Sequence, residues 1–135
     1  MEIELIFFRV QNQLFGIEVK SINRVLTSSI NKKTKKIHLE EAEIPIIDMG
    51  AYLNLNNHKT NGKKEIIVVE LDGVKKGLLV DEILMVLNLN LDRVKLLPPF
   101  IKNTAKKDYF WAVAKLEDEL VLLLDIRKLY GFGNW

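Results

Sequence analysis

The chain has 135 residues, 48% of them hydrophobic, which suffices for one domain or two small packed halves with a hydrophobic core. It has no cysteine, which excludes disulfides, a thiolate nucleophile and thiolate metal ligands, and favours a reducing compartment. The 20 basic and 18 acidic side chains nearly cancel, so the net charge of +2 selects no class of partner.

The first residues, "MEIELIFF", carry Glu2 and Glu4 where a secretory signal would carry positive charge. No apolar run in the chain reaches the length of a membrane span. We therefore expect a cytoplasmic protein that does not insert into the membrane.

Short runs rich in β-branched and aromatic residues predict strands along the whole chain. The expected strands cover residues 3–10, 14–19, 43–49, 65–71, 77–83, 110–116 and 119–126. Short turn signals at 11–13, 72–77 and 116–119 join three pairs of them as hairpins. Brief helical pieces are expected at 50–55 and 126–131, and the polar stretch 56–64 is expected to join two halves.

Two faint repeats support this division into halves. "FGIEVKSINRVL" (15–26) aligns with "KGLLVDEILMVL" (76–87), which places Gly16 on Gly77 at an offset of 61 residues. "IIDMGAYL" (46–53) aligns with "LLLDIRKLY" (122–130), which places Asp48 on Asp125 at an offset of 77. The second half therefore carries about sixteen extra residues, for which 92–108 is the obvious place.

Asp48 and Asp125 each stand where a strand gives way to a helical turn. A carboxylate at such a position can accept hydrogen bonds from free backbone N–H groups. We interpret both residues as caps and not as catalytic groups.

Other candidates for chemistry are few. His38 and His58 are the only histidines, and neither has the spacing of a metal site. No nucleophile or phosphate-binding motif occurs. Asp81 and Glu82 are adjacent in an extended chain and therefore face opposite sides. We expect no enzyme, no metal and no cofactor.

A small basic β-barrel that binds nucleic acid is an alternative. Lysines cluster at 32–33, 35–36, 63–64, 75–76 and 106–107. They are interspersed with acids and few aromatic residues accompany them, so we interpret them as solvated turns and expect no nucleic-acid partner.

Apolar residues that two small barrels would leave unburied favour an interaction module instead. Pro98 and Pro99 forbid regular strand pairing, so Phe100 is expected on a loop. Apolar residues three apart recur in the two halves, and such matching positions can line a groove between the halves. They are Ile22 and Val25, and Ile83 and Val86.

The order of motifs resembles the CheW family of chemotaxis coupling proteins from about residue 5 to 130. The motifs are "FFRVQNQLFGIEVKSINRVL", "IPIIDM", "EIIVVELDGVKKGLLVDEILMVLNL" and "YFWAVAKLEDELVLLLDIRKLY". The resemblance implies an all-β, CheW-like domain of two five-stranded SH3-like barrels packed together. Barrel 1 would span about 1–60 and barrel 2 about 61–135, with the termini exchanged between barrels as an open possibility.

The resemblance also implies function. Such proteins are non-enzymatic adaptors that couple the cytoplasmic tips of chemoreceptors to the regulatory domain of a CheA-type histidine kinase in arrays beneath the inner membrane. The receptor tip would lie in the groove between barrels. The implied receptor-binding residues are Ile22, Glu40, Ile66, Ile83 and Val86, and the implied kinase-binding residues are Pro99 and Phe100.

The sequence departs from the family before "IPIIDM". Where the family reads Asn-Leu-Arg-Gly, this chain reads His38, Leu39, Glu40 and Glu41. An arginine near the receptor groove is thereby replaced by an acid, which reverses a charge. A divergent paralogue that binds the kinase but not ordinary receptors is the corresponding alternative.

Overall fold

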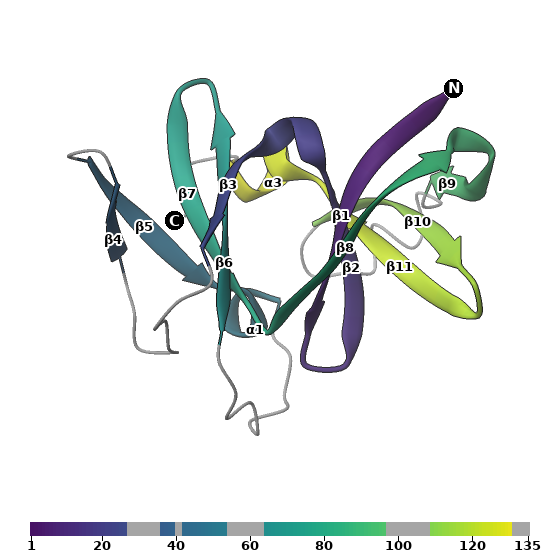
Figure 1. Ribbon diagram of the computed structural model, residues 1–135, viewed down its shortest axis with the longest axis horizontal. Helices are drawn as coiled ribbons and strands as arrows, with labels where there is room; N and C mark the ends of the chain where they lie inside the picture. The colour runs from purple at the N-terminus through teal and green to yellow at the C-terminus, as the bar shows by residue number, and fades with distance from the viewer. Residues whose placement is uncertain (27–35, 40–41, 54–63, 97–108, 131–135) are drawn as a thin grey trace.

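The computed structural model describes residues 1–26, 36–39, 42–53, 64–96 and 109–130. These residues form two antiparallel-rich sheets and a few short helical turns, so the predicted all-β class is confirmed. The two sheets lie on opposite sides along the long axis of the molecule (Figure 1).

The six-stranded sheet has the order β8-β1-β2-β11-β10-β9. Its strands are β1 (Glu2–Val10), β2 (Gln13–Glu18), β8 (Glu82–Asn90), β9 (Val94–Leu96), β10 (Phe110–Leu116) and β11 (Glu119–Leu124). The five-stranded sheet has the order β3-β6-β7-β5-β4. Its strands are β3 (Ile22–Leu26), β4 (Lys36–Leu39), β5 (Ala42–Asp48), β6 (Glu65–Leu71) and β7 (Val74–Val80).

Four short turns complete the described part, namely η1 (Val19–Ser21), α1 (Met49–Tyr52), η2 (Leu91–Arg93) and α3 (Ile126–Tyr130). Strands β3, β4 and β9 were not expected from the sequence. The strand expected at 77–83 spans the end of β7 and the start of β8, which are separated only by Asp81.

The two sheets do not divide the chain at residue 60. Strands β1 and β2 belong to the sheet that also contains β8 to β11, whereas β6 and β7 belong to the sheet of β3 to β5. The first hairpin of the first repeat (β1 and β2) therefore lies in the sheet formed by the rest of the second repeat, and the first hairpin of the second repeat (β6 and β7) lies in the sheet formed by the rest of the first. The expected barrel boundaries, about 1–60 and 61–135, left open an exchange between barrels, and the strand order places the first hairpin of each half in the sheet of the other half.

The sequence repeats correspond to equivalent places in the two sheets. Gly16 of β2 lies opposite Leu123 of parallel strand β11, and Gly77 of β7 lies opposite Ile46 of parallel strand β5. A Cβ atom on Gly16 would lie 2.8 Å from Leu123 Cδ2, and one on Gly77 would lie 2.5 Å from Ile46 Cδ1. Each glycine thus leaves room for the apolar residue two positions before the capping aspartate.

A hydrophobic core shared by both sheets joins them. Side chains of β1 and β2 pack there against side chains of β6 and β7, and α1 and α3 contribute buried residues. The shared core includes Ile6, Phe8, Phe15, Ile17, Met49, Ile67, Val69, Leu78, Val80 and Leu129. A second core lies on the other face of the six-stranded sheet and a third on the other face of the five-stranded sheet.

Both aspartates of the repeat cap the short helices, as predicted. The Asp48 Oδ1 atom accepts hydrogen bonds from the backbone N–H groups of Gly50 at 3.0 Å and Ala51 at 3.4 Å. The Asp125 Oδ1 atom accepts one from the Arg127 N–H at 3.0 Å. Both carboxylates thereby satisfy backbone donors that lack a partner inside the helix.

Candidate functional site

The exposed apolar residues of β3 and β8 form the strongest candidate for an interaction surface. On β3, Ile22 lies opposite Val69 and Val25 lies opposite Ile67. Both of these partners on β6 belong to the shared core. Residues directly opposite in a ladder project to the same face of a sheet. Both residues of β3 therefore extend the shared core toward the edge of the five-stranded sheet.

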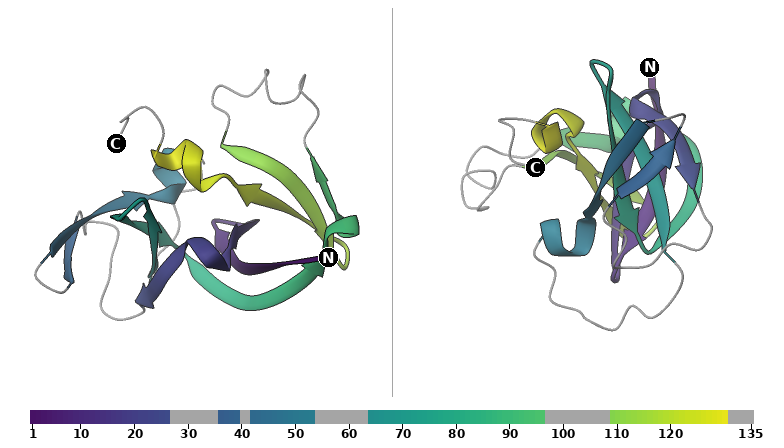
Figure 2. Two further views of the ribbon diagram at one scale, coloured as in Figure 1. Left: turned by 90° about the horizontal axis from the view of Figure 1, so that it is seen from above. Right: turned by 90° about the vertical axis from the view of Figure 1, so that its left-hand side faces the viewer.

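Strand β8 repeats this arrangement at the edge of the other sheet. Ile83 lies opposite Phe8 and Val86 lies opposite Ile6, and both partners belong to the shared core. We call Ile22, Val25, Ile83 and Val86 the β3–β8 surface. Strands β3 and β8 lie on one side of the molecule, away from β10, β11 and α3 (Figure 2).

A β-bulge explains why residues three apart share one face. The pairing of β3 with β6 shifts register between Ile22 and Arg24, and the pairing of β1 with β8 shifts between Phe7 and Phe8, opposite Ile83 and Met85. Each shift places one extra residue on the edge strand, which converts the normal spacing of two into three. The repeated spacing in the sequence therefore records two equivalent bulges.

The β3–β8 surface is partly open to solvent. Val25 is 38% exposed and Val86 is 50% exposed, while Ile22 and Ile83 are half-buried against the shared core. These side chains are held in place by the shared core and still expose apolar surface to solvent. That combination suits the binding of an apolar stripe on a partner.

Ile66, the remaining apolar residue implied by the resemblance, does not belong to this surface. It is 0% exposed and packs in the core on the far face of the five-stranded sheet. Its neighbour Ile67 occupies the shared core, and successive residues of a strand face opposite sides. The structure therefore separates Ile66 from the four surface residues.

A polar clamp fixes the crossing from β7 to β8 beside this surface. The Asp81 carboxylate accepts hydrogen bonds from the Gln11 backbone N–H and from the Lys64 ammonium, and the Asp81 N–H donates to the Arg9 carbonyl at 3.0 Å. The Ile83 N–H donates to the Glu65 carboxylate at 2.6 Å. The clamp ties the first hairpin, β6 and β8 together and so fixes one sheet against the other.

The sequence did not reveal this clamp. In the sequence Asp81 is half of an adjacent carboxylate pair, and Lys64 is part of a lysine cluster. Lys64 is 5% exposed, and only its ion pair with Asp81 makes such burial tolerable. The remaining signal is the position of Asp81 directly after a strand that ends in buried residues.

The described lysines give little support to nucleic-acid binding. Lys64 is buried in the clamp, and Lys76 is largely buried with its ammonium 5.0 Å from the centre of the Tyr130 ring. Burial lowers the pKa of the Lys76 ammonium. Lys36 forms a 3.1 Å ion pair with Glu43, which lowers the pKa of that carboxyl. These three lysine side chains are engaged within the protein.

Groups with catalytic potential are sparse in the described part of the chain. His38 lies on β4, exposed, with Nε2 3.5 Å from the Glu43 carboxylate. Within the described residues no group of three or more His, Cys, Asp or Glu side chains could hold a metal ion. Burial and the nearby Glu70 raise the pKa of Tyr130 to about 12, and its hydroxyl contacts the carbonyls of Val69 and Val74.

Several residues singled out from the sequence lie outside the described residues. They are Glu40, Glu41, His58, Pro99 and Phe100. Among the described helices, none combines the length and the apolar content that crossing a membrane requires.

Comparison with known proteins gives one consistent result. The family model of CheW-like domains matches residues 4–131. A probable chemotaxis protein CheW of Rhizobium etli is 24% identical over 136 aligned residues, which cover 95% of this chain and 87% of that protein. The crystal structure of the scaffolding protein CheW of Thermoanaerobacter tengcongensis superposes with a TM-score of 0.80 at 21% identity, over 100% of this chain and 97% of that one. The predicted pair of SH3-like subdomains is thereby confirmed as the fold.

Proposed function

Because the chain belongs to the family of CheW-like domains, we propose that it is a chemotaxis scaffold that couples a chemoreceptor tip to a CheA-type histidine kinase without catalysing a reaction itself. The observation that carries the proposal is the β3–β8 surface. Two edge strands from two sheets present matching apolar side chains on the margin of one shared core.

The receptor tip is proposed to bind at this surface. A receptor tip is a helical hairpin, and a helix presents apolar residues at intervals of three and four. The pairs Ile22 with Val25 and Ile83 with Val86 each present two apolar side chains on the face that borders the shared core, where such a stripe could pack. The clamp at Asp81 holds the two strands in a fixed relation, so little ordering is required when a rigid hairpin binds.

Binding of the kinase is proposed for a separate part of the chain. The motif that carries this function in the resemblance falls on Pro99 and Phe100, which follow β9. An aromatic side chain next to two prolines combines a large apolar area with a stiff backbone, which is typical of an interface anchor. One protein with two separate surfaces can then connect receptor and kinase.

Calorimetric titration tests both contacts. The protein is titrated with a receptor-tip hairpin and, in a second experiment, with the regulatory domain of the kinase from the same host. Val86→Asp should weaken binding of the hairpin by about tenfold or more, because it places a charge in an apolar contact. Val74→Asp is the matched control, since Val74 has the same exposed fraction of 50% but lies at the start of β7.

The pattern of results distinguishes the alternatives. Hairpin binding that both variants weaken equally, or that neither weakens, would contradict the β3–β8 surface as the receptor site. Binding of the kinase domain alone would identify a divergent paralogue. The acids Glu40 and Glu41, in place of the Arg-Gly of the family, would then explain the loss of receptor binding. Binding of neither partner would remove the proposed coupling function.

A further inference from the structure

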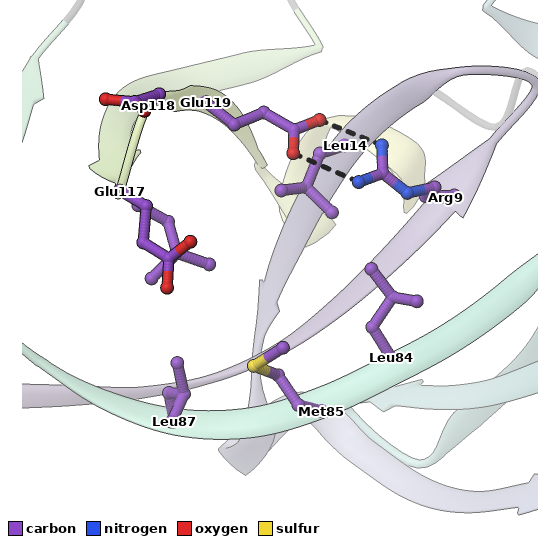
Figure 3. A pocket seen from close by; sticks show the side chains of 9 residues that line it. Arg9, Leu14, Leu84, Met85, Leu87, Glu117, Asp118 and Glu119 are labelled. Carbon is purple, nitrogen blue, oxygen red and sulfur yellow. Dashed lines mark hydrogen bonds and ion pairs between the residues drawn. The ribbon is translucent and has the colours of Figure 1, made fainter.

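A depression lies on the opposite side of β8 from the receptor surface proposed above. It lies between β8 and the turn that joins β10 to β11 (Figure 3). Its apolar residues are Leu14, Leu84, Met85, Leu87 and Leu116, and its polar residues are Arg9, Glu117, Asp118 and Glu119. We call these nine residues the acidic cup.

The floor of the acidic cup is an open end of the second core. Leu14 is buried in that core, and Leu84, Leu87 and Leu116 pack against it while remaining partly exposed. Met85 is 44% exposed beside them. An apolar side chain that entered the cup would therefore extend an existing core and remove leucine surface from water.

The rim of the cup carries two carboxylates, Glu117 and Asp118, that form no ion pair with a described cation. Arg9 binds Glu119 through two contacts, at 2.8 Å and 3.0 Å, so their charges cancel. The Glu117 side chain points from the turn toward Leu87, whereas that of Asp118 points outward (Figure 3). In the described part of the chain no lysine or arginine forms an ion pair with either residue.

The cup is independent of the β3–β8 surface. Leu87 lies opposite Leu5 of β1, which belongs to the second core, whereas Val86 lies opposite Ile6 of the shared core. The two faces of β8 therefore lead to two different surfaces. A partner bound in the cup would leave Ile83 and Val86 accessible.

We propose that the acidic cup is a docking site for a segment of a partner protein that presents a large apolar side chain next to lysine or arginine. The apolar side chain packs between Leu84, Leu87 and Leu116, and the cation pairs with Glu117. An apolar floor and a carboxylate together favour this chemistry over an acidic or purely polar segment. The proposal does not depend on the receptor or kinase contacts.

Amide chemical shifts of the isotopically labelled protein test the proposal with three synthetic hexapeptides. They are KKLFKK, its acidic counterpart EELFEE and the apolar-free KKSGKK, each added to about 1 mM, where short peptides bind measurably. KKLFKK should shift the amides of Leu84, Leu87 and Glu117 and leave those of Ile22 and Val25 unchanged. The other two peptides should bind at least several-fold more weakly.

Two variants sharpen the test. Glu117→Asn should weaken KKLFKK about two- to fivefold, the range of one exposed ion pair, and asparagine accepts the left-handed φ of 56° at this position. Asp72→Asn is the matched control, since Asp72 is also an exposed acid with a positive φ of 52°, in the turn between β6 and β7. It should leave binding unchanged.

Three results would overturn the proposal. One is binding of KKSGKK as strong as that of KKLFKK, which would show that only non-specific charge attraction acts. Another is a set of shifts spread over other acidic surfaces, or no shifts at all. The third is self-association of the unliganded protein that Glu117→Asn abolishes, which would assign the cup to a second copy of this chain.

Discussion

Replacing Gly77 by alanine tests how closely the parallel strands β5 and β7 approach each other. The added Cβ would lie 2.5 Å from Ile46 Cδ1 and 3.0 Å from Ile66 Cγ2. Non-bonded carbon atoms prefer about 3.5–4.0 Å. Ile46 is half-buried and can turn part of its side chain away, but Ile66 is fully buried and β-branched and cannot.

The expected magnitude follows from two opposing terms. Overpacking a core costs about 1–3 kcal/mol, and alanine recovers about 0.4–1 kcal/mol by restricting the unfolded chain. Gly77→Ala should therefore lower the free energy of unfolding by about 1 kcal/mol, within a range of about 0–2.6 kcal/mol. Ile46→Val removes the Cδ1 atom and alone should lower it by about 0.5–1.5 kcal/mol.

Urea unfolding followed by circular dichroism measures the four corners of this double-mutant cycle. The double variant should be more stable than the sum of the single losses predicts, by about 0.5–1 kcal/mol, because the vacated Cδ1 position accepts the new methyl group. Gly73→Ala is the control, since no atom lies within 4 Å of its Cβ position. Its loss of stability should arise only from the positive φ of 81° at this residue. It should be additive with Ile46→Val, and additivity of Gly77→Ala with Ile46→Val to within about 0.3 kcal/mol would refute the close approach.

Three further substitutions probe the polar contacts. Asp125→Ala should destabilise the protein by about 1 kcal/mol through loss of the cap, whereas Asp125→Asn should retain most of it, as chemical denaturation would measure. Asp81→Ala should cost about 3–5 kcal/mol by leaving the buried Lys64 ammonium unpaired, and a thermal melt within a few degrees of the parent protein would contradict the clamp. The hydrogen bond from Arg9 lowers the pKa of the Glu119 carboxyl below its ordinary value of 4.5. The difference in unfolding free energy between the parent protein and Glu119→Gln should therefore be largest above pH 4.5 and vanish as the pH falls through the lower pKa of the folded protein. A difference that grew toward acid pH would be inconsistent with the ion pair.

The sequence allowed the local features of the fold to be predicted. Alternating apolar residues predicted most strands, because each strand buries one face. The caps at Asp48 and Asp125 were predictable because a carboxylate at the start of a helix acts on backbone groups two or three residues away. In both cases the interaction lies within a short stretch of chain.

The arrangement of the strands was not predictable in the same way. The pairing of β1 with β8 joins residues such as Ile6 and Val86, and no local pattern records a contact between such distant residues. The bulges in β3 and β8 changed the spacing of apolar residues from two to three, which concealed both strands. The burial of Ile66 also followed from the tertiary arrangement, since its strand is apolar on both faces.

The candidate surface was partly predictable. Ile22, Val25, Ile83 and Val86 were selected because they recur in both repeats, and the structure places them at equivalent edges of two sheets. The acidic cup was not selected, since Leu84 and Leu87 resembled ordinary core residues and Glu117 an ordinary turn residue. Only the fold brings the turn between β10 and β11 against β8.

The exchange of hairpins makes each repeat a donor and an acceptor of the same structural part. A polypeptide with one repeat alone would have a hairpin without a sheet and a sheet that lacks two strands. Two identical copies could complete each other as a symmetric dimer, which offers a route by which duplication and fusion of a self-associating ancestor would produce this chain. For the same reason, a chain cut between residues 53 and 64 would yield two fragments that are each incomplete and mutually complementary, held together by the shared core and not by the peptide backbone.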